Sequence, residues 1–169
     1  MFGNDFGMNI AYLILGGNLG NRAANIRKAE ILLEQRGVLI TDSSPVYETA
    51  PWNMENCADF LNKVIQVTTK KSAHELLETC LKIEEEFGRL RDQGKYLSRA
   101  IDLDILFFNK EIVNTPQLTL PHPRLHERKF VLTPLEAIAP DFFHPILKKN
   151  IRELLRECPD KLEVRPLIP

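Results

Sequence analysis

Two aspartates, Asp102 and Asp104, lie one residue apart in the stretch SRAIDLDILFF, which otherwise has the composition of a buried strand. Side chains alternate across a strand, so both carboxylates share one face, while Ile101, Leu103 and Ile105 share the other. The two aspartate Cα atoms would be about 6.6 Å apart. Aspartate is depleted in strands, and like charges on one face repel each other. We therefore expect something to offset the repulsion, and the choices are water, an arginine or a metal ion.

Basic residues flank the aspartates on both sides in the sequence. Carboxylates that hold a divalent metal, together with arginine and lysine, are the components of a phosphoryl-transfer site, where the metal bridges phosphate oxygens. The alternative is a solvated strand face with ordinary surface cations around it. The basic residues are Arg89, Arg91, Lys95 and Arg99 before the strand, and His122, Arg124, His126, Arg128 and Lys129 after it.

Other side chains have two interpretations each. Asn62, in the strand pattern FLNKVIQV, could bind the edge of a heterocycle or occupy an exposed strand position. His122, between two prolines, could donate a hydrogen bond to a phosphate or be structural. The aromatic residues Trp52, Phe60 and Phe130 are either core residues or part of a ligand site. We expect two further histidines, His74 and His144, on the surface.

Hydrophobic periodicity predicts strands and helices that alternate irregularly and are joined in places by hairpin turns. This pattern favours an α+β fold with a mostly antiparallel sheet over a doubly wound parallel sheet. The predicted strands are 10–15, 38–49 as an edge strand with a break at Pro45, 60–69, 101–108, a return strand at 111–113, and a terminal strand near 162–167. The predicted helices follow the turn GGNLGNR to about Arg36, with Ile26, Ala29 and Leu33 on one apolar stripe, and run from the Ser72–Glu75 capping box to about Phe87. Two further helices are predicted near 132–140 and 150–158.

Length and composition limit the class of protein. The 169 residues suit one domain, 1–169, with 1–8 as a loose tail. A net charge of −1 argues against nucleic acid or an anionic membrane as a partner. Neither a signal peptide nor a membrane span is recognisable. The three cysteines form no C-x-x-C pair, so a cytoplasmic protein without structural zinc or disulfides is expected.

The longer motifs resemble the 6-hydroxymethyl-7,8-dihydropterin pyrophosphokinase family. SRAIDLDILFFNKEIVN followed by LTLPHPRLHERKFVLTPLEAIAP is similar to its signature region, and AYLILGGNLGNR, SSPVYETAPW, DFLNKVIQV and IEEEFGRLR resemble its other blocks in the same order. The resemblance extends from about Ile10 to Ile151. It implies a ferredoxin-like α+β fold and the transfer of pyrophosphate from ATP to the pterin hydroxymethyl group, with AMP as the second product.

The resemblance also implies roles for particular residues. Asp102 and Asp104 are expected to bind a pair of Mg²⁺ ions on the triphosphate, and Arg89 and Arg99 to join them in catalysis. Contacts to ATP are expected from Glu84, Arg91, Arg99, His122 and Arg128. Contacts to the pterin are expected from Thr49, Trp52, Phe60, Asn62, Tyr96 and Phe130. The partners are then ATP and the pterin, with no nucleic acid and no membrane, and we expect a monomer.

Three positions depart from the family pattern: Gly17 replaces a usual serine, Tyr96 a tryptophan, and Ser98 a proline. None of them removes an expected metal ligand or arginine. The cation-rich segment 88–99 is expected to close over bound ligands. Two other functions remain open. An RNA-binding ferredoxin-like module would want aromatic residues where this strand has acids, and an inactive pterin- or nucleotide-binding relative would not need Asp102, Asp104 and Arg99.

Overall fold

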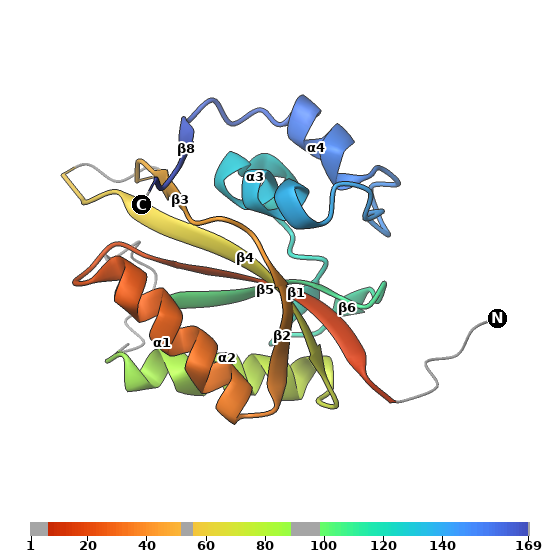
Figure 1. Ribbon diagram of the computed structural model, residues 1–169. Helices are drawn as coiled ribbons and strands as arrows, with labels where there is room; N and C mark the ends of the chain where they lie inside the picture. The colour runs from red at the N-terminus through yellow and green to blue at the C-terminus, as the bar shows by residue number, and fades with distance from the viewer. Residues whose placement is uncertain (1–6, 52–55, 89–98, 169) are drawn as a thin grey trace.

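The computed structural model describes residues 7–51, 56–88 and 99–168 (Figure 1). Its larger sheet has the strand order β5-β1-β4-β3-β8, with β2 also paired to β4. The strands are β1 (Asn9–Gly17), β2 (Val38–Ser43), β3 (Tyr47–Thr49), β4 (Phe60–Thr69), β5 (Asp102–Phe108), β6 (Val113–Asn114), β7 (Thr119–Leu120) and β8 (Val164–Pro166). The helices are α1 (Arg22–Gln35), α2 (Ala73–Glu86), the 3-10 turn η1 (Leu125–Glu127), α3 (Lys129–Ile138) and α4 (Ile151–Glu157).

The sheet separates two hydrophobic cores. In Figure 1, α1 and α2 lie below the sheet, and α3 and α4 lie above it. Alternate residues of β1 show the division, because Leu13 and Leu15 belong to the core with α1 and α2, whereas Tyr12 and Ile14 belong to the core with α3 and α4. The architecture is α+β with antiparallel strand pairs, as the sequence predicted. It is consistent with the ferredoxin-like fold.

Helix α1 follows the turn after β1, as the sequence predicted. The Asn21 side chain accepts a hydrogen bond from the Ala24 N–H at 3.1 Å and so caps the first turn. The predicted stripe of Ile26, Ala29 and Leu33 is buried. The helix ends before Gly37, whose φ of +76° is accessible to glycine at low cost. The stripe fixes which side of α1 faces the sheet.

The extended run 38–49 forms two strands that both pair with β4. Pro45 lies in the gap between them, where the Ser44 hydroxyl accepts a hydrogen bond from the Val64 N–H at 3.0 Å. The predicted break at Pro45 is therefore confirmed. The predicted edge position holds for β2, whose only strand partner in the described sheet is β4, but not for β3, because β8 pairs with its other side.

The return strand predicted at 111–113 is wrong. After the turn at Asn109, which has a φ of +49°, the chain forms a separate two-stranded sheet in which β6 pairs with β7 and not with β5. In β5 itself, a register shift opposite Tyr12 and Leu13 interrupts the simple alternation, and Leu106 and Phe107 both face the core with α3. Such a bulge places two residues opposite one.

The upper core contains an aromatic cluster that includes a histidine. Tyr12 packs edge-on against Phe107 and Phe142, and the His144 ring packs edge-on against Phe107 at 5.5 Å. His144 is only 4% exposed, so the prediction that it is a surface residue is wrong, whereas His74 is exposed as expected. The His144 Nδ1 atom accepts from the Ile146 and Leu147 N–H groups at 3.2 and 3.1 Å. This satisfied ring nitrogen explains how a polar residue is tolerated there.

We expect His144 to make the fold sensitive to acid. Burial, with a smaller effect from His126, lowers the pKa of His144 to about 4. In the unfolded chain the pKa is near 6.5, so the unfolded state binds an extra proton as pH falls through this window, and stability is lost on acidification. His144→Asn keeps an acceptor but does not titrate. Between about pH 7 and pH 4.5 the wild type should lose on the order of 5 °C more in melting temperature than His144→Asn, as differential scanning fluorimetry can measure.

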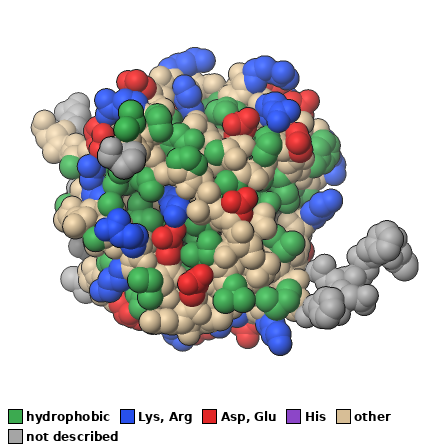
Figure 2. Space-filling model, in the orientation of Figure 1, with side chains coloured by type: hydrophobic (Ala, Val, Ile, Leu, Met, Phe, Trp, Pro, Cys, Tyr) green, Lys and Arg blue, Asp and Glu red, His purple; other side chains and the backbone are tan. Residues whose placement is uncertain are grey.

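The surface carries charges of both signs. Figure 2 shows lysine, arginine and acidic side chains mixed across the visible face, in line with the net charge of −1. None of the described helices has the length and apolar character that a bilayer crossing needs.

Candidate active site

The aspartate strand places its two carboxylates on the face of the sheet that α3 covers. Asp102 and Asp104 pair in register with Gly16 and Ile14 of β1. Both aspartates are partly exposed, whereas Leu103 and Ile105 are buried on the opposite side with α1 and α2. The alternation predicted from the sequence is therefore confirmed. The site lies at the end of the sheet where β1 ends and β4 and β5 begin, at the left of Figure 1.

An arginine lies directly beside one of the carboxylates. The Arg99 Nη1 atom is 2.7 Å from Asp102 Oδ2, and both side chains are roughly seven-tenths buried, at 29% and 28% exposure. Of the three partners considered for the aspartates, the described chain itself thus supplies an arginine for Asp102. The same arginine stays in reach of anything that binds on this face.

Arg99 is held in place through its backbone by the turn after β1. The Asn18 and Leu19 N–H groups donate to the Arg99 carbonyl at 2.9 and 3.2 Å. In return, Asn18 Oδ1 accepts from the Arg99 N–H at 2.8 Å. A Cβ atom on Gly17 would be 2.3 Å from the carbonyl oxygen of Ala100, so glycine at this position permits the close approach. The departure at Gly17 therefore has a structural reason in this chain.

Glu84 lies behind the aspartate strand rather than beside the carboxylates. It is 1% exposed on α2, and its Oε1 atom accepts a hydrogen bond from the Leu103 N–H at 2.9 Å. Leu103 is the residue between the two aspartates, and β5 lies at one end of the sheet. Glu84 therefore fixes the strand that presents the carboxylates. The expectation that it contacts ATP stays a prediction.

Gly16 connects the carboxylates with the predicted pterin residues. It pairs with Asp102 on one side and with Asn62 on the other. A Cβ atom on Gly16 would lie 2.4 Å from Asn62 Oδ1, so the Asn62 amide extends over the glycine. Asn62 is 5% exposed, and its Nδ2 atom donates to Thr49 Oγ1 at 3.1 Å. The absence of a side chain at Gly16 leaves room for the Asn62 amide beside the strand that carries the carboxylates.

His122 is held as a neutral hydrogen-bond donor. Its backbone N–H group donates to the Leu106 carbonyl at 2.9 Å, and its ring Nδ1 atom accepts from the Arg124 backbone N–H at 3.2 Å. The ring proton is therefore assigned to Nε2. Burial, followed by the charges of Arg128 and Arg124, lowers the pKa of His122 to about 4. At neutral pH the ring can donate from Nε2 without adding a positive charge.

The start of α3 brings a cation and an aromatic ring to the same face. The Arg128 guanidinium carbon is 5.8 Å from the centre of the Phe130 ring. Helix α3 packs against β4, the strand that begins with Phe60. Phe60 and Phe130 are both partly exposed, in contrast to the buried core aromatic Phe107. Phe130 also packs against the core with α3 and α4, so a ligand-binding role for Phe60 and Phe130 stays a prediction.

Four of the expected site residues lie outside the described parts of the chain: Trp52, Arg89, Arg91 and Tyr96. The segment expected to close over the ligands falls almost entirely within 89–98 and lies outside them as well. The described residues nevertheless bring together ten of the fourteen predicted positions on or around one end of the sheet. Sequence reasoning did not single out Gly16, and the only signal for it was the turn motif GGNLGNR.

The fold and these side chains define an α+β enzyme of the phosphotransferase class. A carboxylate pair, an arginine beside it and a neutral histidine donor lie on the same side of the sheet as a buried amide and two partly exposed aromatic residues. Comparison with known proteins narrows the class to one family. A family model for 7,8-dihydro-6-hydroxymethylpterin-pyrophosphokinase (HPPK) matches residues 12–140, and the chain belongs to this family. It is an ATP-dependent pterin pyrophosphokinase of folate biosynthesis.

Individual relatives agree with this assignment. The chain is 47% identical over 131 residues to the 2-amino-4-hydroxy-6-hydroxymethyldihydropteridine pyrophosphokinase of Bacillus subtilis, covering 77% of this chain and 78% of that protein. It is 40% identical over 150 residues to the enzyme of the same name from Aquifex aeolicus, covering 89% and 92%. The folic acid synthesis protein fol1 of Schizosaccharomyces pombe is 39% identical over 90% of this chain, which spans only 21% of that longer protein.

Solved structures show the same fold. A Plasmodium falciparum HPPK-DHPS variant crystallised with pteroate superposes with a TM-score of 0.72 over 92% of this chain and 41% of that one. Sequence identity is 19%, so this match supports the architecture alone. The ferredoxin-like α+β fold expected from the sequence is thereby confirmed.

Proposed function

We propose that one end of the sheet binds both substrates side by side, the ATP triphosphate over Asp102 and Asp104 and the pterin over Gly16 and Asn62. The hydroxymethyl oxygen of the pterin then attacks the β-phosphorus of ATP. The bond from that phosphorus to the oxygen bridging to the α-phosphorus breaks, and AMP leaves with that oxygen. The hydroxyl proton is released, and the β- and γ-phosphoryl groups remain together on the pterin.

The donor set fits Mg²⁺. Magnesium in nucleotide sites is usually held by one or two carboxylates together with substrate phosphates and water. Asp102 and Asp104 offer two carboxylates on one face, and the described residues contain no group of three or more metal-binding side chains that would make a closed protein cage. We propose that this pair holds the two Mg²⁺ ions. When bound, such ions neutralise phosphate charge and orient the triphosphate for in-line displacement.

The two arginines, Arg99 and Arg128, and the neutral His122 have separate roles in this proposal. Arg99, fixed by Asn18 and beside Asp102, supplies a permanent charge next to the developing charge on the phosphoryl group. His122 donates a hydrogen bond to the triphosphate from Nε2. Its low pKa keeps the ring neutral, so it adds no positive charge beside Arg128 when ATP is absent. The three groups thus orient and neutralise the triphosphate without a proton transfer of their own.

The pterin half of the site supports the same assignment. Adjacent strands lie about 4.8 Å apart, so Asn62 and Asp102, with Gly16 between them, are about 10 Å apart across the sheet. A flat bicyclic ring can span that distance, with its amide-like edge at Asn62 and its hydroxymethyl group toward the carboxylates. We propose that Phe60 and Phe130 stack on its two faces and that Thr49 holds the Asn62 amide in place. Trp52 and Tyr96 are proposed to complete the pterin contacts.

The observation that supports this proposal best is the register row Asn62–Gly16–Asp102. It joins a heterocycle-binding amide to a phosphate-binding carboxylate across a glycine. An RNA-binding module would need aromatic residues where β5 carries its acids. An inactive relative would not need Arg99 to be fixed beside Asp102 by hydrogen bonds to Asn18.

The proposed pterin site predicts a large effect of Asn62→Leu. The leucine has similar volume but leaves the buried pterin edge and Thr49 Oγ1 without their partner. We expect the KM for the pterin to rise about 30-fold, with the KM for ATP within about twofold of wild type. AMP formation that depends on added 6-hydroxymethyl-7,8-dihydropterin and magnesium is the measurement. An unchanged KM for the pterin would show that Asn62 does not read the substrate.

We also propose that the chain acts as a monomer with residues 1–169 as one domain, in the cytoplasm. Support comes from the single larger sheet that organises both hydrophobic cores. Cys57, Cys80 and Cys158 are free cysteines.

A further inference from the structure

Residues 158–166, which we call the C-terminal strap, run from the end of α4 through β8. They lie outside the range 12–140 that the family model matches. In Figure 1 this segment passes from α4 over α3 to β3, where β8 joins the sheet. The strap thus meets the two elements that form opposite walls of the proposed pterin site, α3 with Phe130 and the β3–β4 pair with Thr49, Phe60 and Asn62.

The first anchor of the strap is at the start of α3. Arg128 occupies the N-cap position of this helix, but its side chain makes no capping hydrogen bond. Asp160 of the strap instead accepts a hydrogen bond from the Lys129 N–H at 2.9 Å through Oδ2, and its Oδ1 atom accepts from the Leu162 N–H at 2.9 Å. A carboxylate at a helix N-terminus is favourable because it meets unpaired N–H groups and the positive end of the helix dipole. Lys129 directly precedes Phe130, so Asp160 fixes the helix turn that carries this ring.

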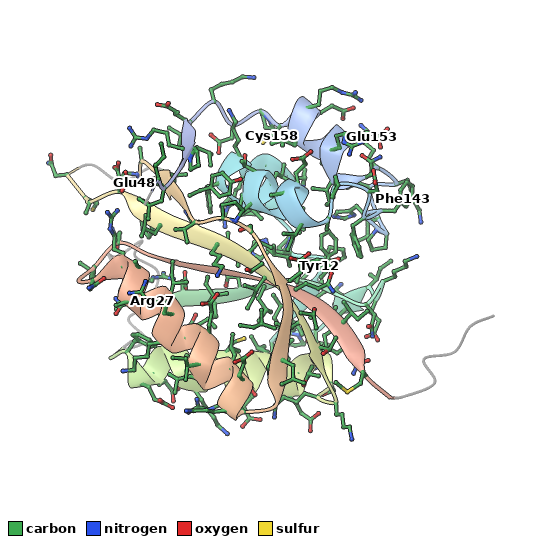
Figure 3. All side chains as sticks on the ribbon, viewed as in Figure 1. Tyr12, Arg27, Glu48, Phe143, Glu153 and Cys158 are labelled. Carbon is green, nitrogen blue, oxygen red and sulfur yellow. The ribbon has the colours of Figure 1, made fainter. Side chains whose placement is uncertain are left out.

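The second anchor is an ionic cluster at β3. Arg165 of the strap lies 3.5 Å from Glu48 and 3.1 Å from Asp59, each measured from Nη2 to a carboxylate oxygen. Arg22 of α1 completes the cluster, with Nη1 at 2.8 Å from Glu48 Oε2 and at 2.7 Å from the Asp59 carbonyl oxygen. The Glu48 label in Figure 3 marks this corner of the molecule, beside β3 and β8.

Each acidic residue of the cluster directly precedes a residue of the proposed pterin site. Glu48 directly precedes Thr49, and Asp59 directly precedes Phe60, so the cluster holds both ends of the segment 50–59. Thr49 and Phe60 are also register partners. A cation that binds both acids at once therefore fixes the spacing of the strand pair that carries Thr49, Phe60 and Asn62. Figure 3 shows Glu48 and Phe143 at opposite sides of the molecule.

We propose that the C-terminal strap positions the pterin pocket, with Asp160 and Arg165 as positioning residues that set the two walls relative to each other. Neither residue contacts the substrate in this proposal. Both act before binding, by keeping Phe130 on one side and Thr49, Phe60 and Asn62 on the other in the binding geometry. The inference rests on the proposed pterin site. It predicts a selective effect on the pterin, because the Asp102, Asp104 and Arg99 side of the site is held by other contacts, from Glu84 and Asn18.

The test uses the full chain with Arg165→Met, Arg165→Lys, Asp160→Ala and Asp160→Asn. Arg152→Met is the matched control, because Arg152 also pairs with two acids, Glu136 and Asp141, but these lie in the last turn of α3 and beyond its end, away from Phe130 in its first turn. We expect Arg165→Met and Asp160→Ala each to raise the KM for the pterin about fivefold, with the KM for ATP and kcat within about twofold of wild type. Arg165→Lys and Asp160→Asn, which keep the charge or the acceptor, should recover most of the loss. Arg152→Met should resemble wild type.

Two further measurements separate positioning from simple stabilisation. Added salt should raise the pterin KM of wild type more than that of Arg165→Met, because the variant has already lost the screened ion pairs. Fluorescence titration of the pterin, with a non-hydrolysable ATP analogue present, should show the same order of affinities. Equal rises in both KM values, or a loss of melting temperature with an unchanged pterin KM, would overturn the proposal. If Asn62→Leu also leaves the pterin KM unchanged, the proposed pterin site itself is wrong.

Discussion

AMP formation should fall on the order of a thousandfold in Asp102→Ala and in Asp104→Ala, while the fold survives. Each variant keeps one carboxylate on the face, which is too few to hold a metal pair on a triphosphate. Losing metal-based stabilisation of transition-state charge costs several kcal/mol, and each 1.36 kcal/mol is tenfold in rate. The measurement is single-turnover production of AMP from ATP and 6-hydroxymethyl-7,8-dihydropterin at saturating magnesium.

Neither aspartate variant should lose much stability in the absence of magnesium. Each removes one of two neighbouring negative charges on the strand face, which relieves their repulsion. Asp102→Ala also loses the ion pair with Arg99 at 2.7 Å, and a partly exposed pair of this kind contributes up to about 1 kcal/mol. Scanning fluorimetry without metal should therefore show both variants folded, with melting temperatures close to that of wild type.

The matched control is Asp42→Ala, because Asp42 is also a strand aspartate but is exposed on β2, away from the site. It should keep wild-type turnover. Magnesium with a non-hydrolysable ATP analogue should raise the melting temperature of wild type and of Asp42→Ala, but not of either site variant. Near-normal turnover in both Asp102→Ala and Asp104→Ala would eliminate their role as metal ligands.

The sequence predicted the elements well wherever local signals decide. The stripe of α1, the capping box of Ser72 and Glu75 in α2, and the alternation in β5 each depend on residues close together in the chain. The failures arise where distant partners decide. Residues 111–113 carry the composition of a strand, but after the Asn109 turn β6 pairs with β7. His144 is polar, yet it is buried because two backbone N–H groups from its own turn satisfy Nδ1.

The candidate site was predictable in its chemistry but not in its supports. Asp102, Asp104 and Asn62 stand out because a strand gives no reason for polar side chains there. The sequence does not reveal that Glu84 bonds the backbone of Leu103, between the aspartates, or that Asn18 bonds the backbone of Arg99, before them. Their roles follow from the packing of α2 and of the β1–α1 turn against β5. Asp160 and Arg165 are further examples, because their partners are 31 and 106 residues away in the chain.

Gly16→Ala should weaken pterin binding selectively, because the register places the new methyl group against the Asn62 side chain. The new Cβ atom would lie 2.4 Å from Asn62 Oδ1 and 3.2 Å from the Leu61 carbonyl oxygen. Asn62 cannot easily move aside, because its Nδ2 atom is bound to Thr49 and the residue is 5% exposed. The amide must therefore rotate away from the substrate edge, and the position between Asn62 and Asp102 gains a methyl group. We expect the KM for the pterin to rise at least about 30-fold, as in Asn62→Leu.

A double-mutant cycle shows whether the collision is the cause. If Gly16→Ala acts through the Asn62 side chain, then Gly16→Ala combined with Asn62→Ala should bind the pterin about as well as Asn62→Ala alone, because the truncated side chain leaves room for the methyl group. ATP affinity should stay near wild type in all three variants, since Asp102, Asp104 and Arg99 keep their own supports. Fully additive losses of pterin affinity would show instead that the methyl group itself blocks the ring, and that the Asn62 amide is not displaced.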